Sequence, residues 1–327
     1  MHRRPELRKR IFELVAAPNP ATRDALLADI AAFQADHVPE YRRLVKARGP
    51  GVALPTDVFR HARVAVHGPK QDVRVFRTSG TTVRARGTHH FRSLELYDLV
   101  AERWARTMLF GEQPARLVVL GPSEHEAPDS SLAYMVARFG EWFGPTYRAW
   151  PLDADHLTRV LDTSERTVVI GTSFAFVHAE EALGTRRFCL PPGSRVMQTG
   201  GFKGRSREVE KSELQAALAA RYGVPEDAIL GEYGMTELSS QAYEVTEGRR
   251  HYRFGPWVRV GIVDPVTLEP TDGEGLLRID DPANLDSCCM IQTADRARRV
   301  GDGFELLGRA RGAVARGCSL AVEEALG

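Results

Sequence analysis

Apolar residues recur at intervals of three and four along the first part of the chain. Between residues 6 and 48 this spacing is typical of helices with one buried face, and prolines divide it into two runs: Leu7, Ile11, Leu14 and Val15 before Pro18 and Pro20, then Leu26, Leu27, Ile30 and Phe33. We therefore expect helices here, followed by an irregular stretch rich in proline and glycine up to about residue 70.

Short apolar runs that end in glycine, serine or threonine turns appear repeatedly between residues 71 and 253. Strands are expected near 73–76, 117–120, 167–170, 195–198 and 228–230, and helices near 93–109, 131–143, 178–183 and 209–222. This alternation is typical of an α/β fold with a mostly parallel sheet covered by helices. Ligands of such sheets bind beyond the carboxyl ends of the strands, where these turns fall.

The pattern changes near residue 254. Runs at 258–263, 275–279 and 304–307 resemble strands joined by Asp-Pro, Asp-Gly and Gly-Glu-Gly turns, which predicts an antiparallel β region. The chain is thus expected to have three parts. A helical segment over 1–70 packs on the main domain, an α/β core covers 71–253, and an antiparallel β subregion covers 254–327.

Composition narrows the class of protein. The 327 residues are 43% hydrophobic and 27% charged with a net charge of +1, so the chain is globular in composition and has no basic footprint for nucleic acid. The cysteines form no Cys-x-x-Cys pair, which argues against zinc or a disulfide scaffold: Cys189, Cys288, Cys289 and Cys318. Residues 1–5 lack the apolar run of a signal peptide, and no stretch approaches about 18 apolar residues. We expect a cytoplasmic protein without a membrane span.

The stretch 231–237, Gly-Glu-Tyr-Gly-Met-Thr-Glu, continues the strand expected at 228–230. It presents a hydroxyl and a carboxylate one after the other. Thr236 is suited to hydrogen-bond a phosphate oxygen, and Glu237 to hold Mg²⁺ through oxygen. Taken alone, the stretch is equally compatible with a strand, a glycine turn and a polar loop.

The loop 78–82 also follows directly on an expected strand and carries four hydroxyls around one glycine. It consists of Thr78, Ser79, Gly80, Thr81 and Thr82. Glycine lets successive N–H groups point into one concavity, and the hydroxyls add donors for phosphate oxygens. A plain Ser/Thr turn is the alternative. His89 and His90 follow closely enough in sequence to approach this loop.

Together these two segments resemble the phosphate loop and the aromatic-Gly-x-Thr-Glu motif of adenylate-forming enzymes, the superfamily of acyl-CoA synthetases, adenylation domains and luciferases. Two further segments match in the same order, Gln292-Thr293-Ala294-Asp295 and Gly308-Arg309-Ala310-Arg311, after a hairpin-like stretch over 263–277. The resemblance implies that Asp295 binds the ribose hydroxyls, for which a carboxylate is a natural acceptor. It also implies ATP and Mg²⁺ as cofactors and further nucleotide-binding residues: Gly201, Glu232, Tyr233, Gly234 and Arg309.

The chain departs from the superfamily's pattern at two places. After Thr82 the usual Gly-x-Pro-Lys is replaced by residues 83–87, Val-Arg-Ala-Arg-Gly. Arg84 or Arg86 is then the source of positive charge over the phosphates, unless this part of the loop is only solvated. The chain also ends at Gly327, just past the segment that precedes the hinge. The resemblance therefore implies that the small C-terminal domain and its adenylation lysine are absent, and argues against an ordinary acyl-CoA ligase.

Residues 199–203 and 316–320 are similar to segments of the acyl-protein synthetases related to LuxE, which share the short length. Members activate a fatty acid as acyl-adenylate and transfer the acyl group to a cysteine near their C-terminus, which implies this role for Cys318. Nearby guanidinium groups would lower the pKa of this thiol if they converge on it, namely those of Arg309, Arg311 and Arg316. The alternative is that Cys318 is a small buried hydrophobic residue.

Three other residues have two interpretations each. Lys203 is the candidate cation facing the carboxylate and the α-phosphate as pyrophosphate leaves, or else a solvated lysine on a glycine-rich loop. Phe174 and Phe176 line an acyl pocket, or else belong to the core.

The sequence therefore predicts an enzyme that activates a carboxylic acid, with a fatty acid implied by the family, as an acyl-adenylate and then transfers the acyl group to a thiol. Lys203, Thr236, Glu237 and Cys318 are the catalytic candidates, and Glu237 is the metal ligand. The expected partners are the small carboxylic acid and a reductase or other acyl-accepting protein, with no nucleic acid. Two alternatives stay open: a ligase that uses an amine, a carrier-protein thiol or CoA as acceptor, and a degenerate fold that binds nucleotide or acyl chains without turnover.

Overall fold

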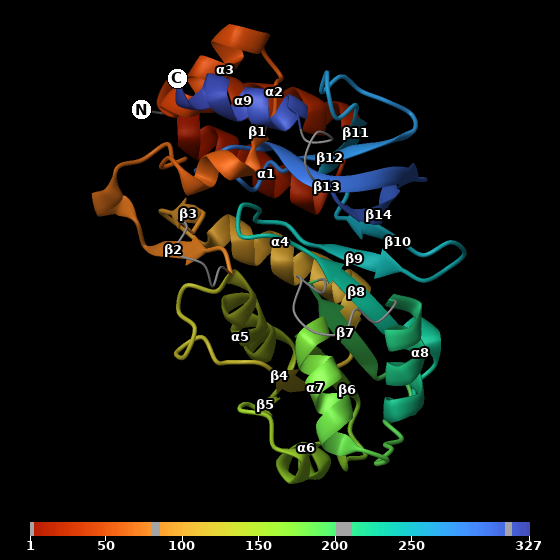
Figure 1. Ribbon diagram of the computed structural model, residues 1–327. Coiled ribbons are helices and arrows are strands. Elements are labelled where there is room, and N and C mark those ends of the chain that lie inside the picture. Colours follow the sequence, from red (N-terminus) through yellow and green to blue (C-terminus); the bar gives the residue numbers. More distant parts are fainter. Residues whose placement is uncertain (1–2, 80–85, 201–210, 311–315) are drawn as a thin grey trace. The chain divides into compact units, whose positions relative to one another are not determined.

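The computed structural model describes residues 3–79, 86–200, 211–310 and 316–327, and the chain divides into two units (Figure 1). The first unit comprises Met1–Ala101, Met235–Gln241 and His251–Gly327, and the second comprises Glu102–Gly234 and Ala242–Arg250. Each unit is assembled from separate stretches of chain, while the three-part division at residues 70 and 253 stays a prediction. No helix within the described ranges is long and apolar enough to cross a membrane.

The second unit is built on a largely parallel sheet. Its strands are β4 (Arg116–Leu120), β5 (Thr146–Arg148), β6 (Thr167–Thr172), β7 (Arg195–Thr199), β8 (Ile229–Tyr233) and β9 (Ala242–Val245). They lie in the order β9-β8-β7-β6-β4-β5, and only the β8–β9 pair is antiparallel. The α/β class predicted from the alternation of strands and helices is confirmed, although β5 and β9 were not expected.

Helices follow the strands of this unit. They are α5 (Ser131–Phe143), α6 (Ala154–Leu161), α7 (Ser173–Leu183) and α8 (Lys211–Tyr222), with a π-helical turn at Arg106–Phe110 and a 3₁₀ turn at Glu226–Ala228. Side chains of the preceding turns cap α5, α6 and α7. Thr172 is both the last residue of β6 and the cap of α7, because its Oγ1 accepts the N–H of Ala175 at 3.1 Å. Strand and helix are therefore joined without a loop, at the carboxyl edge of the sheet.

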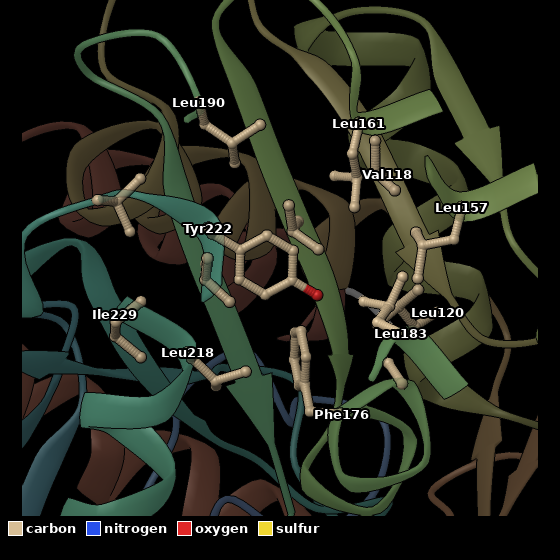
Figure 2. Close-up of a cluster of buried hydrophobic side chains, with 14 of the residues drawn as sticks. Val118, Leu120, Leu157, Leu161, Phe176, Leu183, Leu190, Leu218, Tyr222 and Ile229 are labelled. Atoms are coloured by element: carbon tan, nitrogen blue, oxygen red, sulfur yellow. The ribbon is translucent and has the colours of Figure 1, made fainter. Parts of the chain in front are cut away.

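One hydrophobic core holds α6, α7 and α8 on the sheet of the second unit (Figure 2). The members labelled in Figure 2 come from β4, α6, α7, the 188–190 stretch, α8 and β8: Val118, Leu120, Leu157, Leu161, Phe176, Leu183, Leu190, Leu218, Tyr222 and Ile229. Full burial of one such side chain contributes roughly 1.5–3 kcal/mol. Because these residues alternate with others along each strand, the core also determines which strand residues face the opposite side.

The first unit contains an antiparallel sheet and a separate hairpin. The sheet strands are β10 (His251–Phe254), β11 (Arg259–Val263), β12 (Glu274–Asp280), β13 (Met290–Val300) and β14 (Gly303–Arg309), in the order β11-β12-β13-β14-β10, with β1 (Leu54–Pro55) parallel to β13. The hairpin pairs β2 (Arg74–Arg77) with β3 (Thr88–Phe91). The expected antiparallel region is present, but β13 was missed because arginines interrupt its apolar pattern. Two of them, Arg296 and Arg298, pair with Glu274 across the sheet.

The first unit also contains helices. They are α1 (Arg3–Ala16), α2 (Pro20–His37), α3 (Pro39–Arg48), α4 (Glu95–Ala105), which continues into the second unit, and α9 (Arg316–Leu326), with 3₁₀ turns η1 (Thr56–Arg60) and η2 (Pro69–Gln71). The helices α3 and α9 lie side by side (Figure 1). Their contact includes a hydrogen bond of 2.7 Å from Arg43 Nε to the main-chain oxygen of Ala325 and an ion pair of 2.5 Å between Arg48 and Glu324.

Candidate active site

The predicted phosphate loop is the turn of the β2–β3 hairpin. Its two ends are joined by hydrogen bonds, because Thr78 N donates to Gly87 O and Gly87 N donates to Thr78 Oγ1, both at 3.0 Å. Arg86 Nε donates to Thr78 O at 2.6 Å and its Nη2 to Arg77 O at 3.4 Å. Arg86 therefore braces the base of the loop.

The carboxylate of Glu237 lies against this base. A Cβ on Gly87 would stand 3.1 Å from Thr78 Cγ2, 3.3 Å from Glu237 Oε1 and 3.5 Å from Arg60 Cγ. Glycine at position 87 therefore lets the loop, the carboxylate and the arginine approach one another. The structure thus places Thr78 and Glu237 together, as the paired motifs suggested, and adds Arg60, which the sequence analysis did not single out.

Burial dominates the electrostatics of Glu237. Its side chain is within the interior, and desolvation raises the pKa of this carboxyl to about 7. The guanidinium groups of Arg60 and Arg309 oppose that shift, and the carboxylate of Asp57 reinforces it. A buried carboxylate facing two cations is a group whose charge depends on what else is bound beside it.

The main chain of the Thr-Glu motif is held by Asn284. Its Nδ2 donates to Glu237 O at 2.8 Å, and its Oδ1 accepts the N–H of Ser239 at 2.8 Å. Next to it, Asp281 accepts from both the N–H and the hydroxyl of Ser240, at 2.8 and 2.9 Å. Sequence reasoning missed these residues, although an Asp-Asp-Pro-Ala-Asn run is a recognisable turn signal.

Residues of the N-terminal helices form hydrogen bonds and an ion pair with this turn. Gln34 of α2 donates from Nε2 to Asn284 O at 2.8 Å, and its Oε1 accepts the N–H of Cys289 at 2.8 Å. Arg4 of α1 forms a bidentate ion pair of 2.6 Å per bond with Asp286. Residues of the first helices therefore fix the loop that fixes Glu237, a role that their sequence did not reveal.

His89 connects the hairpin to the same motif. Its Nδ1 lies 2.8 Å from Thr236 O and its Nε2 lies 2.8 Å from Ser287 Oγ. Burial lowers the pKa of this imidazole to about 3, so the ring is neutral. Since a carbonyl only accepts, Nδ1 carries the proton and the Ser287 hydroxyl donates to Nε2. His90 differs, since its ring contacts Asp72 at 3.0 Å and Arg63 at 2.6 Å.

Asp295 and Arg309 occupy facing positions on β13 and β14. The register shifts between Asp295 and Ala297, and such a bulge turns side chains away from their regular direction. Asp295 N donates to Thr293 Oγ1 at 3.1 Å, which fixes the backbone of this segment. The two residues implied to bind nucleotide are thus neighbours, with Asp295 half-buried and Arg309 exposed.

Glu232 lies at the carboxyl end of β8 in the second unit. It is fully buried, burial raises its pKa to about 7, and the Thr199 hydroxyl donates to its carboxylate from the adjacent strand. Tyr233 is buried beside it, and Gly234 is exposed. Five predicted site residues lie outside the described residues: Gly80, Thr81, Thr82, Gly201 and Lys203. Arg84 and Arg311, and the side chain of Arg316, lie outside them as well.

Cys318 sits in the first turn of α9, in a small apolar cluster with Val263 and Leu276. Its Sγ is 3.8 Å from the main-chain oxygen of Thr293, two residues before Asp295. The pKa of the thiol is raised to about 11, first by burial and then by Asp57, against a smaller effect of Arg48. Burial therefore dominates the pKa of this thiol, while Arg311 and the side chain of Arg316, two of the three arginines expected to lower it, lie outside the described residues.

An open pocket of about 770 Å³ lies at the carboxyl ends of β4 and β6 in the second unit. Its walls come from these strands, α5, α7 and the 150–152 stretch, and they are mainly apolar. Phe174 lines the pocket and is 45% exposed, as is Trp150 at 46%. Phe176 is fully buried in the core and does not line the pocket. Phe174 therefore lines a pocket, whereas Phe176 belongs to the core.

Solved ligase structures share this fold. A 2-hydroxyisobutyryl-CoA ligase in complex with 2-HIB-AMP superimposes with a TM-score of 0.63 at 14% identity, over 89% of this chain and 69% of that one. The N-terminal domain of FACL13 from Mycobacterium tuberculosis gives 0.52 at 15% identity, over 73% and 61%. An ATP-bound RpMatB-BxBclM chimera gives 0.52 at 16%, over 74% of this chain and 49%, about half, of that one. The fold is that of adenylate-forming enzymes, as the sequence resemblance implied.

The sequence of the C-terminal half identifies a narrower family. The family model described as acyl-protein synthetase, LuxE, matches residues 151–327, which is more than half of the chain. The chain belongs to this family, and the resemblance seen in the sequence is confirmed. No curated protein matches the chain in sequence.

Proposed function

We propose that the protein uses ATP to activate a carboxylic acid as an acyl-adenylate, with release of pyrophosphate. The observation that carries the proposal is the contact of Glu237 with the closed base of loop 78–87, where Arg60 and Arg309 bear on the same carboxylate. Loop N–H groups and hydroxyls beside a carboxylate and two cations are the groups that a magnesium nucleotide requires.

The remaining nucleotide-binding roles are those that the sequence resemblance implies. Thr236 contacts the α-phosphate, and Asp295 binds the ribose hydroxyls with Arg309 facing it. The resemblance also implies that Lys203, Gly201 and the 232–234 stretch take part in nucleotide binding or catalysis. Loop residues 78–82 supply the donors to the β- and γ-phosphates.

Glu237 fits the proposed Mg²⁺. The described residues contain no cluster of three or more His, Cys, Asp or Glu side chains able to hold a metal. Magnesium in nucleotide enzymes is commonly held by one or two carboxylates together with substrate phosphates, so a single buried carboxylate is a suitable donor set. When bound, the ion neutralises phosphate charge.

The acid substrate is proposed to bind in the apolar pocket of the second unit. The pocket opens at the carboxyl edge of the sheet, and Glu232 is the second-last residue of β8 at the same edge. Its volume lies within the roughly 300–1,000 Å³ typical of small-molecule sites, and its apolar walls suit a hydrocarbon chain. This supports a fatty acid as the substrate.

Acyl transfer to Cys318 is the proposed second step. The sulfur attacks the carbonyl carbon of the mixed anhydride, a C–S bond forms, the C–O bond to AMP breaks, and the thiol proton passes to water. A reductase or other protein then takes the acyl group. The raised pKa of Cys318 favours one second candidate, in which an external amine, carrier-protein thiol or CoA accepts the acyl group directly.

Carboxylate-dependent exchange of pyrophosphate into ATP tests the activation step across a panel of fatty and aryl acids. Exchange that requires an acid supports adenylation, and its absence with every acid points to a binding protein without turnover. Intact-protein mass spectrometry after incubation with ATP and acid tests the acceptor. A mass increase that disappears in Cys318→Ala supports the thioester, whereas the same increase in that variant excludes it.

A further inference from the structure

Arg60 belongs to the N-terminal part of the chain, yet it reaches the phosphate loop. It is the last residue of the 3₁₀ turn η1, directly after Val58 and Phe59, which are buried. The ring of Phe59 packs edge-on against His89 at 6.0 Å between centroids. These anchors place the arginine beside the hairpin that carries the loop.

The stem of Arg60 packs at the base of the loop and its charge acts on Glu237. Its Cγ is 3.5 Å from the point where a Cβ on Gly87 would stand, and Glu237 Oε1 is 3.3 Å from that point. The guanidinium is one of two that stabilise the charged form of Glu237. The side chain is nevertheless 43% exposed, so its head group is accessible to a ligand.

The one ion pair observed for Arg60 within the described ranges is weak. Its Nη1 is 3.5 Å from Asp57 Oδ1, with the two side chains 43% and 51% exposed. Exposed pairs of this kind contribute about 0–1 kcal/mol, so a ligand with more charge displaces the carboxylate readily. Phosphate oxygens suit a guanidinium particularly well, since its planar fork binds two of them at once.

The loop's own Arg86 has a different task. Its guanidinium donates to the carbonyl oxygens of Thr78 and Arg77 and so braces the main chain. A cation on the neighbouring η1 turn therefore complements the loop where the superfamily's usual lysine is replaced.

We propose that Arg60 binds the β- and γ-phosphates of ATP, and the pyrophosphate formed from them, by exchanging Asp57 for phosphate oxygens. The inference rests on the proposed adenylation and assigns a ligand-binding role to the N-terminal part of the chain. It predicts opposite effects for the two partners of the ion pair. Loss of Arg60 weakens triphosphate binding, whereas neutralising Asp57 removes a competitor and strengthens it.

Calorimetric titration of the full chain with MgATP, magnesium pyrophosphate and AMP tests this role. Arg60→Ala should weaken binding of ATP and pyrophosphate by about tenfold, the loss expected for a charge-assisted hydrogen bond, and leave AMP unchanged. Arg60→Lys should recover part of the affinity. Asp57→Asn should bind ATP more tightly than wild type. Arg159→Ala, an exposed arginine on α6, is the matched control and should equal wild type.

Two outcomes overturn the inference. One is equal ATP affinity in Arg60→Ala and wild type. The other is a loss of ATP and AMP binding that is equal for the two ligands and occurs in both Arg60→Ala and Asp57→Asn, together with lowered melting temperatures. That result would mean that the Arg60–Asp57 pair has a structural role only. Wild-type protein that binds MgATP but exchanges no pyrophosphate with any acid refutes the proposed adenylation, while the titrations still decide the role of Arg60. Wild-type protein that binds no nucleotide refutes both.

Discussion

The ring Nδ1 of His89 donates a hydrogen bond of 2.8 Å to the main-chain oxygen of Thr236. One residue of the hairpin that carries the phosphate loop thereby holds the backbone of the motif that ends in Glu237. Ser287 completes the contact by donating to Nε2. The ring is buried, so water cannot replace either partner if the imidazole is removed.

Replacing His89 should show whether its ring positions the backbone of Thr236 and Glu237 or only fills space in the interior. His89→Ala leaves Thr236 O without its donor and should lower the free energy of unfolding by about 1–3 kcal/mol. A small displacement of Thr236 and Glu237 should also reduce exchange activity, on the order of 100-fold. His89→Asn keeps an amide donor near the position of Nδ1. Its exchange activity should therefore be higher than expected from its loss of stability alone. Urea unfolding and exchange kinetics measure both, and His125→Ala, on an exposed loop, is the control. Identical activity in the alanine and asparagine variants would argue against positioning.

The lowered pKa of His89 predicts an acid-sensitive fold. The ordinary value of 6.5 applies to the unfolded chain, and about 3 applies to the folded one. Between these values the unfolded chain binds the additional proton, so this group's contribution is complete above pH 6.5 and is lost as pH falls toward 3. The slope from one such group is about 1.4 kcal/mol per pH unit. Unfolding measured from pH 8 to 4 should show the gap between wild type and His89→Asn narrowing with acid. A constant gap would contradict the buried neutral ring.

Glu237→Gln should remove activity without harming the fold. The buried carboxylate is costly to desolvate, as its raised pKa shows, and glutamine is a neutral side chain of the same shape. We expect loss of pyrophosphate exchange together with a melting temperature at or above that of wild type at pH 8. Thermal melts and exchange assays on the same preparation decide this. Retained exchange would show that the carboxylate is not required.

The rate at which each cysteine is alkylated should decrease as its burial increases. Cys189 is exposed, whereas Cys288, Cys289 and Cys318 are buried, and burial raises the pKa of Cys318 to about 11. Iodoacetamide at pH 7.5 should therefore label Cys189 first in the free protein and Cys318 slowly, as peptide mass spectrometry can follow. ATP and acid together should block labelling of Cys318, because the proposed thioester occupies its sulfur. Rapid labelling of Cys318 in the free protein would contradict its burial in the apolar cluster.

The apolar pocket should set the length of the acid. Ala133 of α5 lines the pocket and is largely buried, so Ala133→Phe adds a ring to its wall. Exchange with long-chain acids should fall at least about tenfold, while short acids, which serve as the internal control, keep their rate. Overpacking should cost about 1–3 kcal/mol, which a thermal melt reveals. An equal loss of exchange activity with short and long acids would indicate that the acid binds at another site.

Local patterns were sufficient for much of the fold. The strands that lead into loop 78–82 and into the Tyr-Gly-x-Thr-Glu motif were expected, because apolar runs bounded by glycine turns are short-range signals. The strand β13 was missed, since its arginines are stabilised by cross-strand glutamates that no local window contains. The surroundings of Cys318 could not be predicted for the same reason. Arginines are close to it in the sequence, whereas in the fold it is buried among apolar side chains.

The sequence by itself determined the class of fold, the family and the identity of the polar groups in the motifs, because each depends on short runs of neighbouring residues. Only the tertiary structure decided which distant groups meet: His89 with Thr236, Asn284 with Glu237, and Arg60 with the base of the loop. It also decided the raised pKa values of Glu237 and Cys318. Burial sets the cost of a charge, and burial is a property of the packed chain that no stretch of sequence carries alone.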